Sequence, residues 1–144
     1  MNNPAKTVTE SPADVVRRLY DALGRGDMPG VLAALHPEVI VDEPGQLPYG
    51  GTHRGREAFA RSVLGAMTGH AAVALTDAEV FEGPTGVVGR LTGTLTAHTT
   101  GEEFPLTMVE IHRVEDGTVR AIDVHTKNPG ELAAFYARAE GGTR

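Results

Sequence analysis

The chain has 144 residues, a length that suits a single domain with a sizeable core. Its formal charge of -6 and isoelectric point near 5.4 disfavour a nucleic-acid partner, because phosphate binding needs clustered lysine and arginine. The absence of cysteine excludes disulfides, thiolate metal sites and cysteine nucleophiles. No apolar run approaches the roughly 18 residues of a membrane span, and the polar N-terminus lacks a signal-peptide pattern, so we expect a cytoplasmic protein without a membrane partner.

The first half of the chain predicts three helices around one short strand. Residues 1–10 have no periodicity and are expected to form a flexible tail. Ser11 and Asp27 are expected to cap two short helices, which end at Gly24 and at His36-Pro37. A strand over residues 39–43, a loop over residues 46–55 rich in glycine and proline, and a third helix over residues 56–67 follow.

The second half predicts an antiparallel meander. Turn signals separate four strands, at residues 72–81, 86–99, 103–114 and 118–126. A last helix begins after Asn128, and residues 139–144 are expected to form a second flexible tail. The sequence therefore predicts one α+β domain over residues 11–138.

One strand carries the main candidates for chemistry. With the period of two that a strand imposes, Glu110 and His112 share an otherwise apolar face with Leu106 and Met108. Burial favours the neutral form of a carboxyl group, so Glu110 is expected to act as a hydrogen-bond donor or proton source. The alternative is that Glu110 and His112 pair with each other or with Arg and Tyr neighbours in a satisfied core.

Four further residues are candidates for the same pocket. Glu43 ends the inward row of the first strand, although a glutamate at a strand end can also turn to solvent. Tyr20 lies on the inner face of the first helix, as part of the core or with its hydroxyl in a cavity. Tyr49 lies in a loop long enough to close over a pocket mouth. Leu91 belongs to a row of small and apolar residues that suits the concave, ligand-facing side of a curved sheet.

The side on which Asp123 lies depends on one turn. A two-residue turn at Asp116-Gly117 would pair Glu110 with Asp123, and one of the two carboxyl groups would then have to hold a proton. A loop one residue longer would turn Asp123 outward. The six histidines show no metal-binding spacing, so neither a metal nor a cofactor is expected.

The order of elements resembles the cone-shaped NTF2-like (cystatin-like) fold, and within it the SnoaL-like and ketosteroid-isomerase-like group. The motifs that carry the resemblance are residues 15–27, 42–44, 47–55 and 110–117. The resemblance implies N-terminal helices packed on a curved, mostly antiparallel sheet, and a homodimer through the outer face of that sheet. It also implies that Glu43 matches the aspartate that moves the proton in ketosteroid isomerases. Glu110 matches their oxyanion-hole acid and the acid/base aspartate of SnoaL-like cyclases.

Three positions depart from the relatives. Leu19 and Val63 stand where ketosteroid isomerases have tyrosines, which disfavours steroid isomerisation. Met108 stands where limonene epoxide hydrolases have an arginine, which disfavours epoxide opening.

The resulting hypothesis is a cofactor-independent acid/base enzyme, of isomerase, cyclase or dehydratase type, acting on a small apolar carbonyl metabolite in an enclosed pocket. Glu43 would take a proton next to the carbonyl, Glu110 would donate one to the enolate, and His112 would orient Glu110 or act as a second acid. The alternative is a non-catalytic module of the same fold that binds a small molecule or dimerises. A third reading is a purely structural protein whose pocket is filled by side chains.

Overall fold

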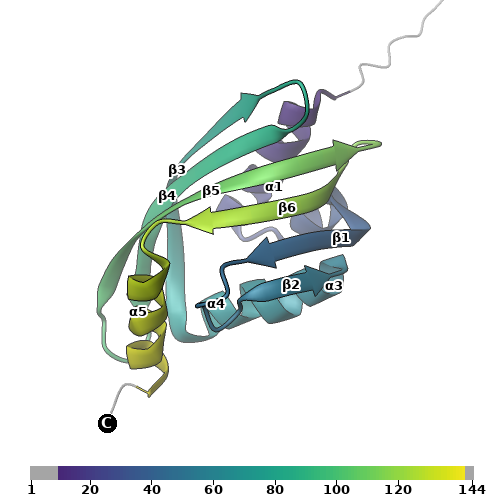
Figure 1. Ribbon diagram of the computed structural model, residues 1–144. Helices are drawn as coiled ribbons and strands as arrows, with labels where there is room; N and C mark the ends of the chain where they lie inside the picture. Colours follow the sequence, from purple (N-terminus) through teal and green to yellow (C-terminus); the bar gives the residue numbers. More distant parts are fainter. Residues whose placement is uncertain (1–9, 142–144) are drawn as a thin grey trace, which may run out of the picture.

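In the computed structural model, which describes residues 10–141, helices pack against a strongly curved six-stranded sheet (Figure 1). The strand order is β2-β1-β6-β5-β4-β3, and every neighbouring pair is antiparallel except β1 and β6, which are parallel. The predicted α+β class is confirmed. The elements are α1 (Pro12–Arg25), α2 (Met28–Ala34), β1 (Leu35–Glu43), β2 (Gly51–Arg54), α3 (Arg56–Ala58), the π-helix η2 (Phe59–Leu64), α4 (Gly65–His70), β3 (Ala71–Glu82), β4 (Val87–Ala97), β5 (Glu103–Glu115), β6 (Thr118–Thr126) and α5 (Pro129–Gly141).

The first helix starts where the sequence predicts and ends later. The Ser11 hydroxyl accepts a hydrogen bond from the backbone N–H of Asp14 (3.1 Å), as expected of an N-cap. The helix continues through Gly24 and ends at Gly26, whose backbone is left-handed (φ 67°). The predicted end at Gly24 was wrong because only the second glycine adopts the left-handed conformation that closes a helix.

The ends of the domain also differ slightly from the prediction. Helix α5 extends to Gly141, and Ala139 is buried, so ordered structure continues past the predicted boundary at residue 138. Glu10 forms an ion pair with Arg18 (2.9 Å). The remainder of the two predicted tails, residues 1–9 and 142–144, lies outside the described residues.

A β-bulge in the β5–β6 hairpin sets the register of the central sheet. Asp116 and Gly117 form the predicted two-residue turn, both with positive φ (53° and 79°). The register then shifts, because Arg120 on β6 is an extra residue without a partner on β5. As a result Glu110 lies opposite Val124 rather than Asp123.

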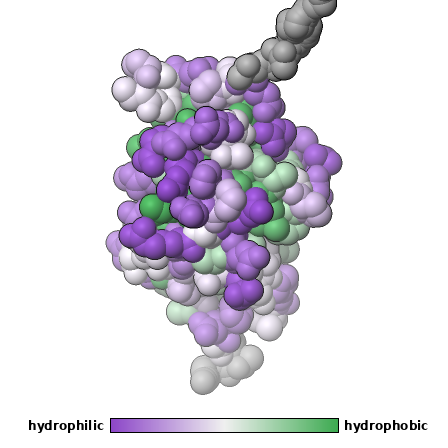
Figure 2. Space-filling view, turned by 90° about the vertical axis from the view of Figure 1, so that its right-hand side faces the viewer, coloured by the Kyte–Doolittle hydropathy of each residue, from purple (hydrophilic) through white to green (hydrophobic). Residues whose placement is uncertain are grey.

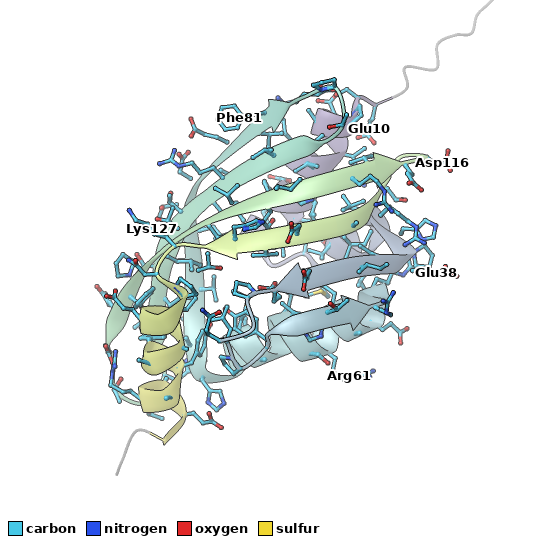
Figure 3. All side chains as sticks on the ribbon, in the orientation of Figure 1. Glu10, Glu38, Arg61, Phe81, Asp116 and Lys127 are labelled. Atoms are coloured by element: carbon cyan, nitrogen blue, oxygen red, sulfur yellow. The ribbon has the colours of Figure 1, made fainter. Side chains whose placement is uncertain are left out.

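The outer face of the sheet carries exposed apolar side chains, whereas the surface at one end of the molecule is mostly hydrophilic (Figure 2). Two large apolar side chains are exposed on the sheet, Phe81 (54 %) and Ile111 (44 %), and Figure 3 shows Phe81 at the edge strand. The surface at the right of Figure 1 is mostly hydrophilic, with scattered apolar patches (Figure 2). The homodimer through the outer face stays a prediction that light scattering tests. No helix within residues 10–141 is both long enough and apolar enough to cross a membrane.

The two glycines at the end of α1 provide a matched test of the fold. Gly24→Ala should raise the free energy of unfolding by about 0.5–1 kcal/mol, since nothing lies within 4 Å of the added Cβ and alanine favours a helix. Gly26→Ala should lower it by about 1 kcal/mol, because φ there is +67°. Urea unfolding measures both, and equal effects would contradict the helix end at Gly26.

Candidate active site

Both candidate glutamates lie in one row across the inner face of the sheet. Glu110 on β5 pairs with Val124 on β6. Asp42 on β1 pairs with Asp123 in the parallel ladder, so Glu43, the next residue, lies beside Val124. One strand thus separates the two glutamates, which places their backbones about 10 Å apart, since strands are about 4.8 Å apart. Residues from opposite halves of the chain meet on one face.

A buried hydrogen-bond network holds the Glu110 carboxyl group. The Tyr20 hydroxyl on α1 donates to Glu110 Oε1 (2.9 Å) and lies 2.8 Å from His112 Nε2. His112 is fully buried, and its Nε2 is 3.4 Å from the same carboxylate oxygen. Burial and the neighbouring Glu110 charge raise the pKa of Tyr20, so its hydroxyl keeps its proton. The predicted pairing of Glu110 and His112 is therefore present, with Tyr20 between them.

The single proton of the Tyr20 hydroxyl fixes the direction of this network. When that proton goes to Glu110, the tyrosine oxygen can only accept from His112, so Nε2 must carry a hydrogen. The other ring nitrogen, Nδ1, is buried and has no partner among the residues described. A hydrogen there would be buried without an acceptor, which favours the tautomer protonated on Nε2 alone. His112 then donates to Tyr20 and Tyr20 donates to Glu110, a chain of hydrogen bonds that ends on the Glu110 carboxyl group.

Gly89 makes room for Tyr20. Gly89 on β4 pairs with Glu110, and a Cβ at this position would lie only 1.9 Å from the Tyr20 hydroxyl. The phenol of α1 therefore packs over the one position of the row that has no side chain. This explains why a glycine stands in the middle of a long strand.

Glu43 has the opposite surroundings. Its side chain is 8 % exposed, and no hydrogen bond to it is found among the residues described. Burial, then the charges of Glu110 and Asp42, raise the pKa of Glu43 from 4.5 to about 8. Near neutral pH Glu43 is therefore mostly a protonated acid.

Two tyrosines form a wall near Glu43. Tyr49, from the loop between β1 and β2, packs edge-to-face on Tyr136 of α5, with ring centroids 5.6 Å apart. Burial is the main cause that raises the pKa of both hydroxyls, to about 12 for Tyr136, and the charge of Glu43 contributes to each shift. The two rings add apolar surface and two neutral hydroxyls close to the acid.

A surface cleft reaches Glu43 where β1 and β6 end. It has a volume of about 490 Å³ and is open to solvent, whereas the sequence predicted an enclosed pocket. Val124, the residue between the two glutamates, lines it as well, whereas Glu110, Tyr20 and His112 are not among its lining residues. Its lining residues are Asp42, Glu43, Pro44, Gly45, Gly51, Asp123, Val124, His125, Thr126 and Pro129.

The other predicted pocket residues divide into two groups. Leu91 is buried and pairs with Met108, whose partner on the other side, Thr126, lines the cleft. Asp123 lines the cleft, but its side chain is 54 % exposed on the outer face, so the outward alternative of the two left open by the sequence is present. The Arg120 bulge shifts the register by one residue, which turns Asp123 away from Glu110. Within residues 10–141 no three His, Asp or Glu side chains are grouped so that they could hold a metal.

Sequence reasoning missed three residues of this site. They are Tyr136, which packs on Tyr49, Val124, which lies between the two glutamates, and Gly89, which makes room for Tyr20. The alternation of β6 places Val124 opposite Glu110 only when the bulge at Arg120 is included. The position of Tyr136 next to Tyr49 depends on how α5 packs, which no local pattern specifies.

Comparisons with known proteins agree with this fold. A sequence model described as the SnoaL-like domain matches residues 16–122. An NTF2-like protein of unknown function from Burkholderia pseudomallei K96243 is 30 % identical, with a TM-score of 0.75 over 86 % of this chain and 95 % of that one. A candidate polyketide cyclase from Xanthomonas campestris pv. campestris is 28 % identical, with a TM-score of 0.72 over 85 % and 94 %.

Two further comparisons concern a structure with the same fold and the curated proteins. A Xanthomonas campestris protein with a cystatin-like fold has a TM-score of 0.74 at 22 % identity, over 88 % of this chain and 98 % of that one, and supports the fold alone. A search of curated proteins found no significant match.

The raised pKa of Glu43 predicts how stability depends on pH. Between pH 4.5 and about 8 the folded protein holds a proton that the unfolded chain has lost. The contribution of Glu43 to the free energy of unfolding therefore falls as pH rises through this window, and levels off above it. Glu43→Gln removes this loss. The free energy of unfolding of the variant, relative to that of the unaltered protein, should therefore increase from pH 5 to pH 8, on the order of a few kcal/mol.

Denaturant unfolding at several pH values measures the effect. Glu38→Gln is the control, because the Glu38 side chain is 80 % exposed. A stability difference for Glu43→Gln that is as flat with pH as that of the control would contradict the assignment.

Proposed function

The chain belongs to the SnoaL-like family of the NTF2-like superfamily, and from that premise we propose that it is a cofactor-independent acid/base enzyme acting on a small, largely apolar carbonyl compound. The observation that carries the proposal is the pair of glutamates in one cross-strand row with unlike surroundings. One accepts a hydrogen bond from Tyr20, and the other is buried without a partner among the residues described. Environments that separate two carboxyl groups in this way provide one base and one acid.

The proposed roles are the reverse of those inferred from the sequence. Glu110, which accepts a hydrogen bond from Tyr20 while His112 donates to Tyr20 in turn, acts as the base. Glu43, which stays protonated near neutral pH because burial raises its pKa to about 8, acts as the acid. The charge of Glu110 itself contributes to keeping the proton on Glu43.

The reaction begins with formation of an enol. The Glu110 carboxylate removes a proton from the carbon next to the carbonyl, the electron pair of that C–H bond forms the C=C bond, and the π pair of the carbonyl moves to oxygen. Glu43 donates its proton to that oxygen, which avoids a free enolate in a poorly hydrated site. The two carboxyl groups rise from the same face of the sheet with one strand between them, so they would contact different atoms of the substrate.

Three outcomes can follow from the same enol. Return of the proton to a different carbon gives isomerisation, attack of the enol carbon on a second carbonyl gives ring closure, and loss of a β-hydroxyl as water gives dehydration. The likeness to a candidate polyketide cyclase supports ring closure. The apolar surroundings, with Leu91, Met108 and Val124, support a substrate with few polar groups. A cytoplasmic location remains a prediction.

Exchange of substrate hydrogen with solvent tests the first step without knowledge of the product. In D2O the protein should catalyse deuterium uptake next to the carbonyl of an apolar ketone such as 1-tetralone, followed by NMR. Glu110→Gln should slow the exchange at least about a hundredfold. Glu43→Gln should slow it as well, and the rate with the unaltered protein should fall above pH 8 as Glu43 loses its proton. Glu38→Gln should leave the rate unchanged, since this side chain is exposed.

Two results would contradict the proposal. Exchange that is unchanged in both Glu43→Gln and Glu110→Gln would remove the acid/base assignment. A small molecule that co-purifies in native mass spectrometry, is bound by both variants, and is never converted would support the non-catalytic binding module instead.

A further inference from the structure

The rim of the cleft carries a concentration of negative charge. Asp42 and Asp123 are paired across the parallel strands β1 and β6, and both side chains are exposed on the outer face. Thr52 donates to Asp42 (3.3 Å), and His125 Nε2 lies 3.1 Å from Asp123. Neither carboxylate has an ion pair with Lys or Arg among the described residues, and no Lys or Arg lines the cleft.

A second observation connects this rim to a ligand. Glu43 lines the same cleft, is more than nine-tenths buried, and has no hydrogen-bond partner among residues 10–141. The Glu43 carboxyl oxygens are not among the fully buried side-chain atoms without a partner in the described part of the chain, so part of this carboxyl group is in contact with solvent. Because Asp42 and Asp123 line the same cleft, a molecule that reaches Glu43 through it also comes near these two aspartates.

We propose that this cleft is the mouth of the active site and that it selects carbonyl compounds whose other end carries a positive charge, such as a protonated amine. The inference rests on the proposed function for the position of the carbonyl, and adds the class of substrate. A cleft lined by charge of one sign attracts ligands of the opposite sign, and the net charge of -6 acts in the same direction. An anionic ligand would have no counter-ion in the cleft.

Two neighbouring basic residues, His125 and Lys127, bear on this selection of a positive charge. The imidazole of His125 lies against Asp123 and can donate a hydrogen bond to it in its neutral form. Lys127 follows the lining residue Thr126 at the end of β6, but it is not among the residues that line the cleft. The two aspartates therefore face no lysine or arginine among the lining residues.

A series of matched ketones tests the selection by binding alone. The probes are 4-(aminomethyl)acetophenone, 4-ethylacetophenone and 4-acetylphenylacetate, which share the aromatic ketone and differ in the charge of the para group. NMR titration, with the amides of Gly45 and Val124 as reporters of the cleft, gives the dissociation constants. The amine should bind about tenfold more tightly than the neutral ketone, and the acid more weakly than both. Added salt should reduce these differences.

The double variant Asp42→Asn and Asp123→Asn removes both rim charges without changing the shape of the cleft. It should bring the amine to the affinity of the neutral ketone. Asp116→Asn is the matched control, because Asp116 is an exposed aspartate at the opposite end of β6, in the hairpin turn (Figure 3), and asparagine tolerates its positive φ. The control should keep the preference for the amine.

The outcomes separate this inference from the proposed function. Equal binding of the amine and the neutral ketone, a preference that persists in the double variant, or no shift at Gly45 and Val124 up to the solubility limit of the amine would each overturn it. The preference should also persist in Glu110→Gln, which lacks the proposed base. A protein that prefers the amine yet shows no deuterium exchange would keep the mouth and lose the catalytic assignment.

Discussion

The unequal surroundings of two carboxyl groups in one cross-strand row are the constraint on which the site depends. Glu110 receives a hydrogen bond from Tyr20, whereas Glu43 is buried without one among the residues described. Two ionised carboxylates near one another in a poorly hydrated site repel each other. The ionised form of one group therefore favours the protonated form of the other. The surroundings decide which, and they favour a proton on Glu43.

Much of the fold can be predicted from local signals. The cap at Ser11, the turn at Asp116-Gly117 and the alternation in β5 each give correct elements, because they depend on residues close in the chain. The same alternation correctly places Glu110 and His112 on one face. The parallel pairing of β1 with β6 then brings Glu43 into the row, as the family resemblance implied.

The rest depends on long-range packing that the sequence does not display. A single extra residue at Arg120 reverses the side of Asp123, and nothing in the alternation of β6 marks it as a bulge. The proposed roles of the two glutamates are the reverse of the sequence-based prediction for a similar reason. The sequence places both glutamates in apolar rows, but it does not show that Tyr20 reaches Glu110 over Gly89 while Glu43 has no such donor.

The bulge also links the two halves of the proposed function. By turning Asp123 outward it places that carboxylate beside Asp42, on the rim, and it leaves Val124 as the only side chain between the two glutamates in the row. One register shift thus separates the proposed acid and base, on the inner face, from the proposed rim carboxylates, on the outer face.

The protonation state of Glu43 is the point on which the acid/base assignment depends most directly. Carbon-13 NMR of the side-chain carboxyl groups in the unliganded protein, with the Glu43→Gln spectrum as the assignment, measures it across the pH range. A Glu43 signal that titrates near pH 8 is the expected result. A midpoint near 4.5, the ordinary value for this group, would contradict the assignment of Glu43 as the acid.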